Sequence, residues 1–303
     1  MPLRIAVVPA STKAGRETIR QLLETESKPF VRGIYRDPSK APSDFTQNPN
    51  FEATKGDVGT GAGLDFSSAD AVFYIPPPTY DGTDQGEWAT RCAENVKRAT
   101  QDATSVKRLL LFSALGAQHD HDIGILRLNH ISDTILKDVA QEVIVVRPGF
   151  FHDEFAHALE EARADPPVFH TWITPVDHKI PMVSLKDIAK VCANTLLAGS
   201  GKPSPHCFKL FGPRHYSALD VKEAVEQATG RKVELKPVER DQLAGFFGQQ
   251  IPQAHLQEFV DMVIAVLPGG IIQDDFDEDE STVRGDIELV DTLRELAAKG
   301  TDK

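Results

Sequence analysis

The chain has 303 residues, of which 41% are hydrophobic and 26% are charged, and its formal net charge is -12 at pH 7. This length and balance predict a globular protein with a large core, built as one generous domain or as one domain with a smaller lobe. The negative charge argues against a nucleic-acid partner bound through a generally basic surface. No apolar run is long enough to span a bilayer and no signal-peptide pattern is present, so we expect no membrane partner and a cytoplasmic location.

The three cysteines, Cys92, Cys192 and Cys207, are far apart and form no paired motif. We therefore expect neither a disulfide framework nor a zinc site, and interpret all three as buried small hydrophobic residues. His119 and His121 alternate with aspartates in one segment. No further ligand accompanies them, so this segment is expected to be a solvated loop and no metal site is predicted.

The first forty residues have the order strand, tight loop, helix, strand. A β-branched run over 3–8 predicts the first strand, residues 9–15 turn the chain, and helical apolar spacing follows over 16–24. A second strand is expected over 30–38 and carries the basic residue Arg36 near its end. This order and spacing are typical of a dinucleotide-binding unit, in which the loop places a pyrophosphate at the helix N-terminus.

Strands continue to alternate with helices after this unit. We expect helices over 88–103 and 125–139 and strands over 51–57, 71–75, 107–113 and 143–146. The alternation predicts an α/β fold, a Rossmann-like doubly wound parallel sheet, as the cofactor domain over 1–150. Residues 151–303 are expected to form a smaller, mixed α/β but mainly helical C-terminal substrate lobe, interleaved with the Rossmann sheet through late strands.

Within this lobe we expect a late strand over 207–213 and a helix that Ser217 caps and Gly230 closes. Another helix is expected to begin at Asp187. From residue 239 onward the chain is expected to be mainly helical.

Several segments in this order resemble the NmrA-like branch of atypical short-chain dehydrogenases/reductases, of the fungal secondary-metabolism type. Besides the opening strand and loop, they are residues 35–38, 56–57, 106–108, 113–114, 147–151, 179–184, 187–189 and 212–213. The resemblance covers nearly the whole chain. It implies a Rossmann domain that binds NADP(H) and a lobe that binds a small-molecule substrate.

The phosphate loop departs from the family pattern, because Pro9 and Thr12 stand at its first two glycine positions and only Gly15 is kept. Glycines there let the backbone approach the pyrophosphate closely. The helix N-terminus still offers N–H groups, and Ser11 and Lys13 add polar and cationic contacts. We expect binding in an altered form; the alternative is a degenerate loop that binds nothing.

Arg36 favours NADP(H) over NAD(H), since an arginine at this place can pair with a 2′-phosphate. The alternative is a surface arginine paired with Asp37. The residues expected to contact the cofactor are Pro9, Ala10, Ser11, Thr12, Lys13, Ala14, Gly15, Arg36, Asp57, Ile75, Pro76, Pro77, Pro78, Ser113, Ala114, His130, Pro148 and Phe150.

The second departure concerns proton transfer. Many relatives use a Tyr and a Lys one helical turn apart, but none of the four tyrosines here is followed by Lys four residues later. The resemblance places His130 near the position of a lysine in NmrA-like relatives, where it would donate a proton or anchor the nicotinamide ribose; a packed or surface histidine is the alternative. His130, Asp133 and Asp153 are the candidate catalytic residues.

Without that pair, a C=N or activated C=C substrate is favoured over a simple ketone, because hydride itself neutralises an iminium ion. We expect an NADPH-dependent reductase of a natural-product intermediate in fungal alkaloid-type biosynthesis. In one form of this hypothesis, hydride transfer is coupled to closure of a ring in the substrate. The alternative is a non-catalytic NADP(H)-binding redox sensor. Oligomeric state and substrate identity are not predicted. The expected substrate-lining residues are Tyr80, Trp88, Leu115, Phe151, Trp172, Phe246 and Phe247.

Overall fold

A computed structural model describes residues 2–299 and divides the chain into two compact units. The first unit comprises the chain up to residue 117 together with 127–147 and 188–208. The second comprises 118–126, 148–187 and the chain from 209 onward. The chain thus leaves the first unit after residues 117, 147 and 208 and returns to it twice, at residues 127 and 188.

The first unit is built on a mostly parallel sheet, which confirms the expected Rossmann-like α/β fold. Its strand order is β10-β6-β5-β4-β1-β2-β3, and the pairings among β1 to β6 are parallel. The strands are β1 (Arg4–Val8), β2 (Phe30–Tyr35), β3 (Phe51–Lys55), β4 (Ala71–Tyr74), β5 (Arg108–Phe112), β6 (Glu142–Pro148) and β10 (His206–Phe211). The order reverses beside β1, where doubly wound sheets bind ligands beyond the carboxyl ends of their strands.

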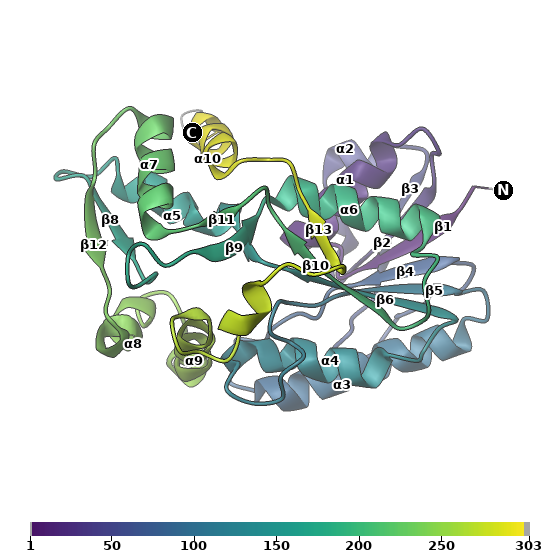
Figure 1. Cartoon of the computed structure of the whole chain (residues 1–303). Coiled ribbons are helices and arrows are strands. Elements are labelled where there is room, and N and C mark those ends of the chain that lie inside the picture. Colours follow the sequence, from purple (N-terminus) through teal and green to yellow (C-terminus); the bar gives the residue numbers. More distant parts are fainter. Residues whose placement is uncertain (1, 300–303) are drawn as a thin grey trace. The chain divides into compact units, whose positions relative to one another are not determined.

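Helices cover both faces of this sheet. Figure 1 shows α3 (Gln85–Asp102) and α4 (Arg127–Leu136) on one face, and α1 (Lys13–Glu24) and α6 (Leu185–Ala198) on the other; α2 (Ser43–Thr46) is a short helix before β3. Leu109, Leu110 and Leu111 of β5 are all fully buried. Burial on both faces explains why these central strands are near-continuous apolar runs instead of alternating patterns.

The second unit is mixed and mainly helical, as expected from the sequence. Its strands form a sheet of β7 (Phe150–Phe151), β9 (Ile180–Val183) and β11 (His215–Tyr216), a parallel pair of β8 (Val168–Thr171) and β12 (Glu234–Pro237), and β13 (Thr282–Arg284), which pairs with the end of β10. Its α-helices are α5 (Ala156–Glu161), α7 (Ala218–Thr229), α8 (Leu243–Phe247), α9 (Leu256–Val266) and α10 (Leu289–Lys299). Short 3-10 helices lie at Gly124–Leu126, His152–Phe155, Arg240–Gln242, Gln253–His255 and Gln273–Phe276.

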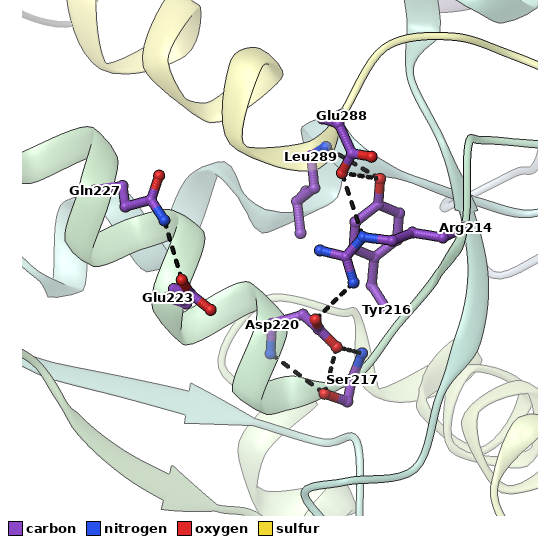
Figure 2. Close-up of polar contacts among 8 residues, drawn as sticks. All are labelled: Arg214, Tyr216, Ser217, Asp220, Glu223, Gln227, Glu288 and Leu289. Carbon is purple, nitrogen blue, oxygen red and sulfur yellow. Dashed lines mark hydrogen bonds and ion pairs between the residues drawn. The ribbon is translucent and has the colours of Figure 1, made fainter.

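A polar cluster joins the start of α7 to the start of α10. Ser217 caps α7 as expected, its hydroxyl accepting from the backbone N–H of Asp220, and Gly230 ends the helix in the left-handed conformation at φ 71°. Figure 2 shows Arg214 between the carboxylates of Asp220 and Glu288, at 2.6 and 3.3 Å. The Tyr216 hydroxyl donates to Glu288 at 2.9 Å. The cluster therefore fixes the two helix N-termini against each other.

Two expectations need correction. Helix α1 begins at Lys13 instead of Arg16, because Thr12 caps it, so Lys13, Ala14 and Gly15 belong to its first turn. Cys207 is exposed on β10, whereas Cys92 and Cys192 are buried as expected.

Between residues 2 and 299, no helix combines the length and apolar character needed to cross a membrane.

Candidate functional site

The loop after β1 is closed by its own side chains. The Thr12 hydroxyl accepts from the Gly15 N–H at 3.0 Å and donates to the Pro9 carbonyl at 3.1 Å. The Ala10 N–H donates to the Ile34 carbonyl, which ties the loop to the end of β2. A Cβ on Gly15 would lie 2.8 Å from both the Pro9 carbonyl oxygen and Thr12 Oγ1. Gly15 is therefore required for the close approach of α1 to the loop, and the Thr12 hydroxyl serves the cap.

The charges at the start of α1 favour an anion. No acidic residue lies in the first turn, whereas Lys13 and Arg16, both exposed, do. Cations at a helix N-terminus oppose the helix dipole, which ordinarily favours Asp or Glu there. A phosphate group would reverse that effect, because it would meet N–H groups and two cations together. This end of the sheet fits the pyrophosphate of a dinucleotide.

Arg36 follows β2 directly and is exposed. Within residues 2–299 it has no hydrogen bond or ion pair. Asp37 instead accepts from the backbone N–H and hydroxyl of Ser39, at 3.1 and 2.7 Å, which lowers its pKa. The alternative of an Arg36–Asp37 pair is therefore wrong, and the guanidinium is available to a ligand.

Three other expected contact regions are partly occupied by contacts within the first unit. Asp57 accepts from the Gly59 N–H at 2.8 Å and so closes the turn after β3. The Trp88 indole donates to the Pro77 carbonyl at 2.8 Å, and its ring lies directly against Gly59. Ile75 and Pro76 are buried, whereas Pro78 and Tyr80 are exposed beyond the end of β4.

A half-buried carboxylate lies beyond the end of β5. Asp133 on α4 accepts from the Ser113 hydroxyl at 2.8 Å and from the Arg147 guanidinium on β6 at 3.0 Å. Burial raises the pKa of Asp133 above its ordinary value, and Arg147 and Ser113 offset part of that effect. Its second oxygen, Oδ1, is buried without a hydrogen-bond partner in the described part of the chain. The carboxylate thus links the ends of two central strands to α4.

His130 lies one helical turn before Asp133 and is half-buried. Its Nδ1 is 3.0 Å from the Ala117 carbonyl oxygen. A carbonyl can only accept, so Nδ1 carries a proton in this contact and Nε2 is the nitrogen that can gain or lose one. Nε2 has no partner among the residues that the structure describes. The structure therefore orients His130 through Ala117, one helical turn before the carboxylate that accepts from Ser113.

The remaining predicted residues are distributed between the two units. In the first unit, Leu115 is buried and Ala114 is half-buried. In the second, Phe150 packs against Trp172 with ring centroids 5.3 Å apart, and Phe246 packs against Phe247 at 5.1 Å. Pro148, Phe151 and Asp153 also belong to the second unit.

Sequence reasoning missed two residues of the site. Arg147 falls within the segment 147–151 that carries the family resemblance, but no role was expected for it, although a charged side chain beside a buried strand signals a partner. Arg16 was not considered because the helix was expected to begin with it. Its place in the first turn follows from Thr12, a preferred capping residue three positions before a glycine.

Comparisons with known proteins bear on the family and the fold. Residues 10–198 match the model of the NAD(P)H-binding family. The chain is 29% identical over 177 residues to agroclavine dehydrogenase of Claviceps purpurea (strain 20.1). The aligned part is 57% of this chain and 55% of that protein, so the chain spans about half the length of this curated relative.

Two solved structures share the fold. One is the Citrobacter sp. triphenylmethane reductase complexed with NADP(H), with TM-score 0.73, 16% identity, and coverage of 97% of this chain and 100% of that chain. The other is the NADPH-dependent quinone oxidoreductase of Escherichia coli complexed with NADPH, with TM-score 0.74 and 16% identity. The match covers 96% of this chain and 99% of that chain. This chain therefore has the same fold as these two proteins. Because the family model spans more than half of the chain, this protein belongs to the NAD(P)H-binding family.

Proposed function

We propose that this protein is an NADPH-dependent reductase of a small natural-product intermediate with a C=N or activated C=C bond. The observation that carries the proposal is the cationic first turn of α1 beside an unpaired Arg36, at the end of the sheet where such folds bind dinucleotides. Lys13 and Arg16 would meet the phosphates, and Arg36 would meet the 2′-phosphate. Agroclavine dehydrogenase, as a relative, supports an alkaloid-type substrate.

His130 is the residue best oriented to act on bound ligands. Bound NADPH would supply a hydride. The Nδ1 contact to Ala117 fixes the imidazole ring, so Nε2 is left to donate a proton or to hold a ribose hydroxyl. Arg147, 3.0 Å from the Asp133 carboxylate, favours the charged form of that group, which in that form would stabilise a protonated imidazole one turn away. Asp133 would act as a positioning residue, because its Oδ2 is held by Ser113 and Arg147 and its Oδ1 is buried.

The substrate class follows from what this group lacks. A ketone needs a proton donor as charge develops on oxygen, and with the usual Tyr and Lys absent this whole demand would fall on His130. Hydride transfer to an iminium ion needs no such donor, and hydride transfer to an activated C=C leaves one proton for His130 to supply. The same absence of Tyr and Lys favours the second candidate function, a redox sensor that binds NADP(H) without turnover.

The experiment that separates the two functions follows the absorbance of reduced nicotinamide at about 340 nm. This absorbance falls as NADPH gives up its hydride. We expect consumption of NADPH with a cyclic iminium substrate or an enal, and slower consumption with a matched ketone. Mass spectrometry of the product distinguishes simple reduction from reduction coupled to ring closure. Tight binding of both NADPH and NADP⁺ with no turnover on either substrate would establish the sensor instead.

A further inference from the structure

The second unit contains an open cavity of about 570 Å³. It is lined by Thr174, Pro175, Glu239, Arg240, Asp241 and Pro268. These residues come from three places: the stretch after β8, the segment leading into α8, and the turn after α9. The volume falls within the range of small-molecule sites in proteins.

One hydrogen bond holds two walls of this cavity together. The Arg240 guanidinium donates to the Pro268 carbonyl oxygen at 2.6 Å. The cavity is therefore a built feature of the second unit, because its acidic segment is tied to the turn after α9. Pro175 and Pro268 give it two rigid apolar surfaces.

The cavity has an excess of negative charge. Glu239 and Asp241 flank Arg240 in sequence and are exposed, and neither forms an ion pair with another residue in the 2–299 range. Two carboxylates and one guanidinium leave a net charge that a cationic ligand would neutralise.

Thr174 adds a polar group to the wall of the cavity. The residue lines the cavity and is only 9% exposed, and its hydroxyl has no hydrogen-bond partner in the described chain. The hydroxyl oxygen is not among the fully buried unpaired atoms, so it stays accessible to water or to a ligand. A ligand in the cavity would form a hydrogen bond with it in place of water.

We propose that this cavity binds a small organic ammonium ion. Its N–H groups would donate to the carboxylates of Glu239 and Asp241, the Thr174 hydroxyl would bond to a polar group of the ligand, and the apolar body would lie against Pro175 and Pro268. As a substrate or product site it rests on the proposed function, since reduction of a C=N bond yields an amine. The test of the cavity measures binding without turnover, so the ammonium site and the reductase function can fail separately.

The experiment titrates the full-length protein by calorimetry with three indoles of similar size. Tryptamine carries a positive charge at neutral pH, 3-methylindole is uncharged, and indole-3-propionate is negative. We expect tryptamine to bind at least about tenfold more tightly than either of the others. The variants are Asp241→Asn, Glu239→Gln and Thr174→Val, and the control is Glu160→Gln, an exposed carboxylate of α5.

Each variant at the cavity should weaken tryptamine binding by about fivefold or more, with Glu160→Gln unchanged. NADPH binding, measured in parallel, reports whether each variant is folded. Equal affinities for the three indoles, equal affinities across the variants, or the absence of saturable tryptamine binding would each overturn the proposal. None of these outcomes depends on NADPH consumption.

Discussion

Arg36 is the residue on which the choice between NADPH and NADH depends. Its guanidinium is exposed and unpaired within residues 2–299, so it can form a charge-assisted contact to the 2′-phosphate that only NADPH carries. Such contacts contribute about 1.5–3 kcal/mol. We expect Arg36→Ala to raise the Kd for NADPH by about tenfold or more and to leave that for NADH unchanged, as measured by fluorescence titration. Arg98→Ala removes an exposed charge from α3 and serves as the control. If Arg36→Ala leaves the ratio of the Kd values for NADPH and NADH unchanged, the role of Arg36 is contradicted.

His130 has two proposed roles that one substitution separates. If Nε2 donates a proton, His130→Gln should lower kcat for an activated C=C substrate by about 10²–10⁴-fold and spare kcat for an iminium ion. If Nε2 instead holds the nicotinamide ribose, the KM for NADPH should rise equally with both substrates. Steady-state kinetics with the two substrates decides between these roles. Unchanged kinetics with both would assign His130 to packing alone.

The residues predicted from sequence were those whose position along the chain implies a position on the sheet. Ser113 follows a central strand, and the structure does connect it to Asp133. Arg147 was missed because its importance comes from a partner on another element, which no local pattern reveals. Thr12 was expected to contact phosphate, whereas its hydroxyl is used by the cap and by Pro9.

At the scale of elements, the start of α1 depends on Gly15. A Cβ there would meet the Pro9 carbonyl at 2.8 Å, so α1 would have to move away from the loop. We expect Gly15→Ala to lower the free energy of unfolding by about 1–3 kcal/mol and to weaken NADPH binding. Gly245→Ala is the matched control, since a Cβ there meets nothing within 4 Å and α8 would be unchanged or slightly stabilised. Urea denaturation of both variants checks the expectation, which fails if they behave alike.

The last turn of α7 is held by one carboxylate. Glu226 accepts from Lys232 at 2.7 Å, from Lys222 at 3.1 Å and from the Val233 N–H at 3.1 Å. The Lys232 contact is the main cause of its low pKa, which falls from 4.5 to about 2. A carboxyl group with a lowered folded-state pKa adds stability that is present above about 4.5 and is lost as the pH falls toward about 2.

Urea denaturation at several pH values tests this anchor. The wild type should lose stability more steeply than Glu226→Gln between pH 4.5 and 2. Glu223→Gln, on the same helix and bonded only to Gln227 in the described residues, should follow the wild type. Parallel curves for all three proteins would show that the anchor contributes nothing measurable.

Which elements were predictable follows from what stabilises them. Central strands such as β4 and β5 are continuous apolar runs because both faces are buried, so their sequences identify them. In contrast, β12 reads Glu-Leu-Lys-Pro and forms by pairing with β8. Neither β12 nor β13 was expected, because short polar strands depend on a partner that is distant in sequence.

At the scale of the whole molecule, the proposed cofactor site and the proposed ammonium cavity belong to different units. The phosphate loop and Arg36 lie in the first unit, whereas the cavity is lined by residues 174–175, 239–241 and 268 of the second. NADPH and an ammonium ligand would therefore contact different units. Hydrogen exchange measured by mass spectrometry tests this division directly. NADPH should slow exchange around residues 10–16 and 35–37, and tryptamine should slow it around 239–241, because a bound ligand suppresses local opening. Protection of the same segments by both ligands would contradict the division.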